Sequence, residues 1–263
     1  MFPVRSRAVL AAGMLVSLIA GWAVADSTGA TTPDDTVAES SVAGTLDTLA
    51  DTSVAITPEI AVLPPDEPWA GLSRSEWEVR AWQWVASMPE DVSPWRDTTG
   101  ERCGYGQSGP VFFLTGAADE ITCVVAEGTA ILVSSIGTEC STLEPPPWFG
   151  RTEDELRACA SAEIDPYTDV RASINGQEVA DLGSYRISSP LFTLTFPENN
   201  VFGAEPGVAQ SVSDSYSFII APPPPGEYEI ATSAMHPDTP EPWAMTVNLV
   251  VEAPQVIEPV TTT

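Results

Sequence analysis

The sequence predicts a mainly β domain, an antiparallel β-sandwich or its jelly-roll variant, with two accessory α-helices. Three features support this class. Short β-branched and aromatic runs recur between turns, the dipeptide Asn175-Gly176 separates two of them, and two helix-capping patterns precede apolar periodicity. Asn-Gly is a strong hairpin signal because both residues tolerate positive φ.

About eight short strands are expected, separated by turns rich in Gly and Pro. They fall in the segments GPVFFLTG, ITCVVAEG, TAILVSSI, DVRASINGQEVADL, SPLFTLTFPEN, YSFIIAPPPPGEYEIATSA and WAMTVNLVVEA. In the last segment, Met245, Val247, Leu249 and Val251 stand at every second position. This period of two is typical of a strand with one buried face.

The first helix is expected between Ser73 and Pro89. Ser73 is the N-cap and Glu76 completes a capping box, while Pro89 ends the helix. The apolar face comprises Trp77, Ala81, Trp84, Val85 and Met88. Trp82 falls outside this stripe, so we expect it to be exposed.

The second helix is expected in the segment GRTEDELRACASAEID. Thr152 is its N-cap and Glu155 completes the capping box. Acidic residues in its first turn interact favourably with the helix dipole. Cys159 lies within this helix and could connect it to the segment around Cys140.

The N-terminus predicts export. Arg5 and Arg7 precede an apolar run, and Ala23-Val24-Ala25 matches the small-x-small pattern of a signal-peptidase site. Residues 1–25 are therefore read as a signal peptide cleaved before Asp26, and an uncleaved N-terminal anchor is the alternative. After cleavage we expect a secreted, extracellular or periplasmic protein without stable membrane insertion.

Three further segments follow the signal peptide. Residues 26–68 contain nine acidic residues and no aromatic or basic residue, a composition that predicts a disordered linker. Residues 69–253 have the size of a single domain. Residues 254–263 are expected to form a disordered tail.

The four cysteines predict two disulfides in an oxidising compartment. We favour the pairs Cys103–Cys123 and Cys140–Cys159, because each closes a loop of about 20 residues, worth roughly 3 kcal/mol in the chain-entropy model. A zinc site is the rival interpretation. It is disfavoured because no spacing is C-x-x-C and His236 is the only histidine.

The net charge of the chain limits the classes of partner that it can bind. Without the signal peptide the chain has 8 basic and 37 acidic residues, a net charge of −29, and it has no lysine. Such a surface repels nucleic acids and anionic lipids, which we exclude as partners. It attracts divalent cations, so a structural calcium ion stays open, while no cofactor is indicated.

The glycines Gly104, Gly106 and Gly109 have G-x-G-x-x-G spacing. A dinucleotide-binding loop requires a strand before these glycines and a helix after them. Here a turn-rich segment precedes them, and Pro110 and a β-prone run follow. The sequence therefore predicts a loop that leads into a strand.

Few residues in the sequence indicate a catalytic or ligand-binding role. His236 lies in a proline-rich turn and no G-x-S-x-G motif occurs, so no catalytic residue is assigned. Glu139, beside a cysteine at an expected strand end, is the least arbitrary acidic candidate for ligand binding. Trp82 is the second candidate, since an exposed indole can stack on a sugar ring.

The chain resembles a family of exported, uncharacterised bacterial proteins. The resemblance rests on the tryptophan helix, the segment DTTG-x-x-C-x-x-GQ-x-GPV-x-FL and the β-rich C-terminal region, in that order. It implies a secreted β-rich domain with two disulfides and no particular activity.

We therefore expect a secreted, non-catalytic binding or cell-surface module of unknown ligand, with carbohydrate as one candidate. A secreted hydrolase that uses carboxylates and a structural envelope protein are the alternatives. Converging carboxylates in a pocket would favour the hydrolase, and an exposed Trp82 would favour carbohydrate binding.

Overall fold

The computed structural model describes residues 60–115 and 119–254, which form one compact unit. The predicted signal peptide, most of the predicted linker and all but the first residue of the predicted tail lie outside the described residues. Within them the protein is mainly β with two α-helices, as the sequence predicted. None of these helices is long and apolar enough to cross a membrane.

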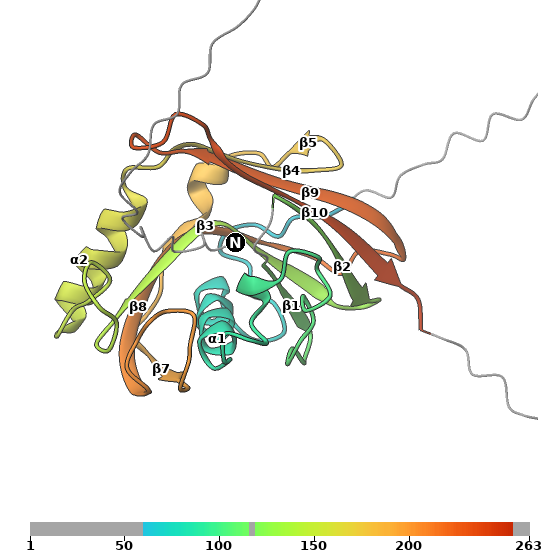
Figure 1. The fold of residues 1–263 in the computed structure, drawn as a ribbon. Coiled ribbons are helices and arrows are strands. Elements are labelled where there is room, and N and C mark those ends of the chain that lie inside the picture. Colours follow the sequence, from blue (N-terminus) through green and yellow to red (C-terminus); the bar gives the residue numbers. More distant parts are fainter. Residues whose placement is uncertain (1–59, 116–118, 255–263) are drawn as a thin grey trace, which may run out of the picture. The chain divides into compact units, whose positions relative to one another are not determined.

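The first sheet is built around two long neighbouring strands, β3 and β8 (Figure 1). Its strands are β1 (Val111–Leu114), β3 (Ala130–Ser141), β8 (Gly207–Ile220), β6 (Arg186–Ser188) and β7 (Phe192–Phe196). The order is β1-β3-β8-β6, and β7 also pairs with β8. The ladder between β3 and β8 runs from Ile131–Ile220 to Ser141–Ser211 with one irregularity after Ser134.

The second sheet has the order β2-β10-β9-β4-β5. Its strands are β2 (Glu120–Ala126), β10 (Trp243–Glu252), β9 (Gly226–Met235), β4 (Thr168–Ile174) and β5 (Gln177–Glu178). The predicted Asn175-Gly176 hairpin joins β4 to β5, and both turn residues have positive φ. Such backbone geometry is what a two-residue hairpin loop requires.

The sheets are mixed, so the prediction of an antiparallel arrangement is wrong in part. β1 runs parallel to β3, and β2 runs parallel to β10. β2 lies between β1 and β3 in the sequence, and most of the domain lies between β2 and β10, so no hairpin fixes the direction of either pair. The described strands do not close into a barrel, and a jelly roll is not confirmed.

Both sheets contribute to one apolar core. Ile131 and Phe218 of the first sheet share it with Val247, Leu249 and Ile230 of the second. The period-two pattern of β10 places its alternate residues in this core, as predicted. Burial of such side chains contributes about 1.5–3 kcal/mol each and holds the sheets together.

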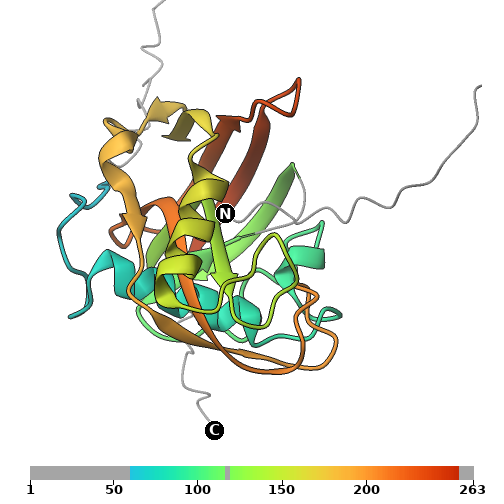
Figure 2. The ribbon, with the colours of Figure 1, turned by 90° about the vertical axis from the view of Figure 1, so that its left-hand side faces the viewer.

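Two helices lie on opposite faces of the first sheet, α1 (Arg74–Ala86) and α2 (Glu153–Ile164) (Figures 1 and 2). The predicted capping box of Ser73 and Glu76 is present in α1. Thr152 caps α2 as predicted, but Glu155 accepts a hydrogen bond from the backbone N–H of Arg151 rather than from the cap residue. The Glu155 carboxylate therefore pairs with the backbone N–H of the residue before the N-cap.

Both predicted disulfides are present. Cys103–Cys123 joins the loop before β1 to β2, and Cys140–Cys159 joins β3 to α2. None of the cysteines is free. The second bond fixes α2 covalently to the sheet.

The packed unit extends further toward the N-terminus than the predicted start at Trp69. Val62 forms a β-bridge with Ile220, and the N–H of Leu63 donates to the carbonyl of Ile219 at 2.8 Å. Ile60 and Val62 pack against the main core. Ile60 and Val62 therefore belong to the folded unit, because they pack on the core and the edge of β8 is free to pair with them. The polar composition of the segment around them does not prevent this.

Candidate functional site

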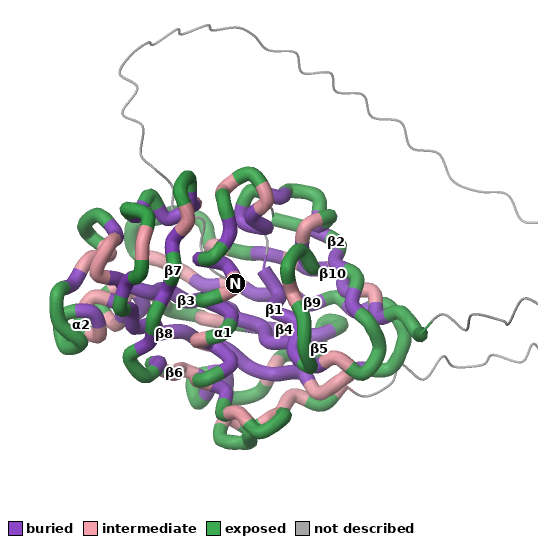
Figure 3. Tube along the Cα trace, turned by 90° about the horizontal axis from the view of Figure 1, so that it is seen from below, coloured by how far each residue is buried: buried purple, intermediate pink, exposed green. Residues whose placement is uncertain are grey.

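A row of buried polar side chains follows the paired strands β3 and β8 on the face that α1 covers. We call it the serine row, and its members are Ser134, Glu139, Ser141, Ser211, Ser213, Ser215 and Ser217. Each member is exposed by 3% or less. Figure 3 shows the buried trace along both strands. Polar side chains here occupy positions that a core would normally give to apolar ones.

The strand register places the row on one face. Glu139 lies opposite Ser213, and Ser134 lies opposite Ser217. Directly opposed residues of an antiparallel pair point to the same face, as do alternate residues of one strand. Ala209 and Ile219 continue the β8 series at either end, and both pack against apolar residues of α1. The row therefore lies between two apolar clusters beneath α1.

Two charged residues of α1 lie at one end of the row. Arg74 Nη1 donates to the carbonyl oxygens of Tyr185 at 2.6 Å and Ser217 at 2.8 Å. One helical turn later, Glu78 Oε1 accepts from Ser134 Oγ at 3.3 Å. Both side chains are buried. Helix α1 thus brings one cation and one carboxylate onto the row.

Burial shifts the pKa values of both groups. It raises the pKa of Glu78, although serine hydroxyls and the charge of Arg74 oppose the rise. It also lowers the pKa of Arg74, and the charge of Glu78 opposes that change. Low polarity disfavours the charged form of any group. The neutral form of Glu78 is therefore favoured over a wider pH range than in an exposed glutamate.

Two further carboxylates lie at the other end. Glu139 Oε2 accepts from Ser211 Oγ at 2.8 Å. Glu144, just beyond β3, accepts from Ser141 Oγ at 3.0 Å. Their exposed fractions are 0% and 2%. The row thus has carboxyl groups at both ends, with Arg74 beside Glu78 at one of them, and hydroxyls between.

Several buried oxygens of the row have unused hydrogen-bonding capacity. Among residues 60–115 and 119–254, Glu78 Oε2, Ser213 Oγ and Ser215 Oγ have no hydrogen-bond partner, and neither does Ser135 Oγ at the irregularity of β3. Most buried polar atoms in native proteins are paired, and each unpaired one costs about 1–3 kcal/mol. Such atoms commonly bind ordered water or a ligand.

The expectation that Trp82 is exposed is wrong. Its exposed fraction is 1%, and its ring packs edge-on against Trp95 and beside Phe202. Helix α1 buries two neighbouring stripes, so Glu78 and Trp82 are both inside, whereas Trp84 is only partly buried. Trp84 Nε1 instead donates to the carbonyl of Tyr105 at 2.9 Å.

Of the two predicted ligand-binding residues, Glu139 lies in the serine row, and Trp82 belongs to the apolar cluster at one end of it. The remaining row members were missed. The signal was present as alternating serines in the segment SVSDSYS, residues 211–217, which resembles the exposed face of a strand. Only the tertiary structure reveals that a helix covers this face.

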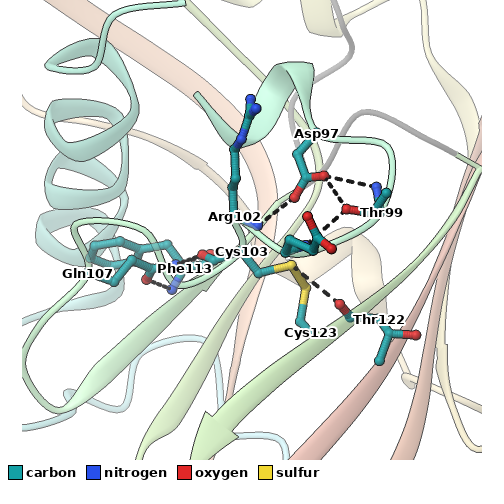
Figure 4. The surroundings of a disulfide bond; sticks show 9 residues. Asp97, Thr99, Arg102, Cys103, Gln107, Phe113, Thr122 and Cys123 are labelled. Atoms are coloured by element: carbon teal, nitrogen blue, oxygen red, sulfur yellow. Dashed lines mark hydrogen bonds between the residues drawn. A yellow bond between two sulfur atoms is a disulfide. The ribbon is translucent and has the colours of Figure 1, made fainter. Parts of the chain in front are cut away.

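The glycine-rich segment is a loop leading into β1, as predicted. The Gln107 side chain donates to the carbonyls of Cys103 and Phe113, and it accepts from the N–H of Phe113 (Figure 4). These bonds attach the loop to β1. The loop is thus fixed by a side chain and by the Cys103–Cys123 disulfide.

Asp97 organises the turn before this loop. Its carboxylate accepts from the N–H of Arg102 at 2.6 Å and from the N–H and hydroxyl of Thr99 at 2.9 and 2.7 Å (Figure 4). Burial alone would raise the pKa of Asp97, but these hydrogen bonds outweigh it and lower the pKa. The turn presses Gly100 against the backbone of Thr122 in β2.

Other polar groups do not form a comparable site. His236 lies on the turn between β9 and β10, where its ring contacts Tyr167 and its Nδ1 accepts from the N–H of Asp238. In the described ranges, no three His, Cys, Asp or Glu residues come together to hold a metal ion. The outer face of the second sheet has shallow grooves of about 300 and 490 Å³, lined mainly by small or exposed side chains.

We expect Gly100→Ala to lower the free energy of unfolding by at least about 2 kcal/mol more than Gly109→Ala does. Both glycines have positive φ, so each change strains the backbone by about 1–2 kcal/mol. Only at residue 100 would the new Cβ overlap the carbonyl oxygen of Thr122, whereas residue 109 has open space. Urea denaturation measures both values, and equal losses would contradict the close contact.

We expect Glu78→Gln to become progressively more stabilising, relative to the natural protein, as pH rises from 4.5 to 7. A raised pKa in the folded state means that the contribution of Glu78 is complete below its unfolded pKa and is lost as pH rises through the folded pKa. Each unit of that rise corresponds to about 1.4 kcal/mol. Glutamine does not ionise and avoids this loss.

The free energy of unfolding at several pH values measures this effect. Glu127→Gln, at an exposed turn, is the matched control and should show no comparable trend. A Glu78→Gln variant that is less stable than the natural protein at pH 7 would mean that Arg74 keeps the buried carboxylate ionised.

Comparisons with known proteins identify no family for this chain. No family model matches it, and no curated protein matches it. Similar solved structures include the cysteine protease inhibitor EhICP2 from Entamoeba histolytica (12% identity, 54% of this chain, 96% of that chain, TM-score 0.24) and Amebosin (11%, 55%, 100%, 0.21). PbICP-C, solved in complex with falcipain-2, is another (15%, 56%, 100%, 0.20). TM-scores this low carry no argument about fold or function.

Proposed function

We propose that this protein is an exported, non-catalytic binding module whose small polar ligand occupies the serine row. The observation that supports the proposal is the set of buried oxygens with unused hydrogen-bonding capacity, from Glu78, Ser213 and Ser215. They belong to two different elements and face the same layer between α1 and the sheet. A ligand that pairs with them removes the cost of leaving them unpaired.

Burial of the polar side chains of the row costs free energy, and this cost supports a role beyond stability. Apolar side chains at the same positions would bury equal area without desolvating polar groups. The second sheet fills its inner positions in that way, with Val247 and Leu249 as examples. Retention of hydroxyls under α1 is therefore best explained by a partner that hydrogen-bonds to them.

Catalysis is the weaker alternative. A nucleophile requires a base within hydrogen-bond reach, and the only histidine, His236, lies on the turn between β9 and β10 rather than in the row. The hydroxyls of Ser134, Ser141 and Ser211 donate to carboxylates at 2.8–3.3 Å, which does not by itself make a catalytic pair. Carbohydrate stacking on Trp82 is also disfavoured, because a ring exposed by 1% offers no platform.

Access to the row requires its cover to open. The row is closed to solvent, so a ligand can reach it only when α1 or an adjoining segment moves. Binding that waits for such a motion is slower than the usual 10⁵–10⁷ M⁻¹s⁻¹. Slow association with a small molecule is thus a property that distinguishes this site from an open surface groove.

We expect Ser215→Ala to abolish ligand-induced stabilisation while leaving the unliganded protein as stable as before, or more so. The hydroxyl has no partner to lose, and removal of an unpaired buried group is neutral or favourable. The measurement is the melting temperature of the purified protein with and without small ammonium salts, diols and monosaccharides, since a ligand that binds the folded state raises it.

Ser233→Ala is the matched control. Ser233 lies on the opposite, outer side of the second sheet, where it is partly exposed and lines a shallow groove. It should respond to every compound as the natural protein does. If no compound stabilises the natural protein, or if Ser215→Ala responds unchanged, the serine row is not the binding site and a structural envelope role is favoured.

A further inference from the structure

We propose that α1 is a pH-gated cover, which opens locally from the first sheet more often as pH rises because the carboxylate of Glu78 is solvated only in the open position. This inference rests on the proposed function, since it names how access to the serine row is regulated. It follows from the surroundings of Glu78 and from the way in which α1 is attached to the sheet.

Glu78 is poorly placed to hold a charge while α1 is closed. Its exposed fraction is 1%, so water does not reach the side chain. Oε1 accepts one hydrogen bond, from Ser134 Oγ at 3.3 Å, and Oε2 has no partner in the part of the chain that the structure describes. An ionised carboxylate has about four lone-pair sites for donors, and burial without them disfavours the charged form. The closed position therefore suits the neutral carboxyl group.

The cation that acts on Glu78 is Arg74, and its guanidinium is bonded to carbonyl oxygens. Arg74 lies one turn earlier on α1 and donates to the carbonyls of Tyr185 and Ser217 at 2.6 and 2.8 Å. Its Nε donates to the carbonyl of Pro65 at 3.2 Å. The charge of Arg74 favours the charged form of Glu78, but burial outweighs this effect and raises the pKa of Glu78.

The strands that face α1 do not supply a positive charge. Strands β1 and β7 face the helix with apolar side chains, and β8 contributes serine hydroxyls. On β3 the serine row adds Glu139, which is itself a carboxyl group. Tyr185 and Asp66 are the titratable groups beside Arg74. Each of these groups is neutral or acidic, so none favours the charged form of Glu78.

The position of Glu78 links its charge to the docking of α1. Its one side-chain hydrogen bond within the described residues crosses from the helix to β3. Trp77 and Ala81, beside it on the helix, pack into one of the apolar clusters on the sheet. Helix α1 contains no cysteine, whereas Cys140–Cys159 ties α2 to β3. Local opening favours elements with fewer constraints, so a charge at Glu78 acts first on α1.

Opening of α1 is therefore linked to the release of a proton. In the open position the carboxyl group meets water and has its ordinary pKa of about 4.3. The contribution of Glu78 to closure is complete below this value and is lost as pH rises through the raised pKa of the closed form. Between the two values the equilibrium constant for opening increases by about tenfold per pH unit, and above both it levels off.

The test is hydrogen exchange of the purified natural protein and of Glu78→Gln, followed by mass spectrometry at several pH values between about 4 and 8. Exchange through brief local opening is proportional to the opening constant. The ratio of the two proteins at the same pH removes the pH dependence of the exchange chemistry. Peptides from α1 report the cover, and peptides from the central strands β9 and β10 report global unfolding.

We expect α1 to exchange faster than β9 and β10 in the natural protein. The ratio of natural protein to Glu78→Gln in α1 should increase with pH, by up to about tenfold per unit, because glutamine does not ionise. Glu127→Gln, at an exposed turn, is the matched control, and its ratio should not change with pH. If Glu78→Gln does not fold, the pH dependence of α1 protection in the natural protein alone gives the same answer.

Two results would overturn the inference. Equal protection of α1, β9 and β10 at every pH would mean that the helix opens only when the whole domain unfolds. A ratio in α1 that does not change with pH would mean that Glu78 keeps one protonation state throughout.

The proposed function is separable from this result, because the exchange experiment contains no ligand. Ligand-induced stabilisation that is lost in Ser215→Ala, together with a constant ratio in α1, would keep the proposed function and overturn the pH-gated cover. A ratio that increases with pH in a protein that no compound stabilises would confirm the movement of α1 and overturn the proposed function alone.

Discussion

The ladder between β3 and β8 extends from Ile131–Ile220 to Ser141–Ser211, and both helices are packed on it. Its inner face joins the second sheet at one end, through Ile131 and Phe218, and receives α2 at the other, through Cys140 and Val212. Its outer face carries α1 and the serine row. Because this one strand pair contacts the second sheet and both helices, its length and register fix the position of the serine row.

The two faces of this ladder are packed with different kinds of side chain. The inner face is mostly apolar, with Thr138 and Asp214 as polar exceptions, whereas on the outer face hydroxyls and carboxylates lie between two apolar clusters. A buried polar layer lowers stability unless every member is satisfied. The two disulfides, each closing a loop of about 20 residues, contribute roughly 3 kcal/mol apiece against that cost.

Local patterns in the sequence were enough for much of the fold. The capping box at Ser73, the Asn175-Gly176 hairpin and both disulfide pairs involve short-range rules and are present. The parallel pairing of β1 and β2 was not predictable, since it depends on long-range contacts that periodicity does not encode. The same limit applies to the site: Glu139 was a candidate, but its serine neighbours on β8 look like solvent-facing residues until α1 is placed over them.

The attachment of the two helices differs in a way that bears on access to the row. Helix α2 is bonded covalently to β3 through Cys140–Cys159 and is further tied to β6 and β8 by Arg186, which bridges Asp165 and Asp214. Helix α1 is held by noncovalent contacts, which include the carbonyl bonds of Arg74, the bonds of Gln83 to Thr193 and of Trp84 to Tyr105, and its apolar side chains. Local opening favours regions with fewer constraints. In the proposed opening of the row, α1 is therefore the covering element without a covalent tie, whereas the disulfide fixes α2 on the opposite face of the sheet.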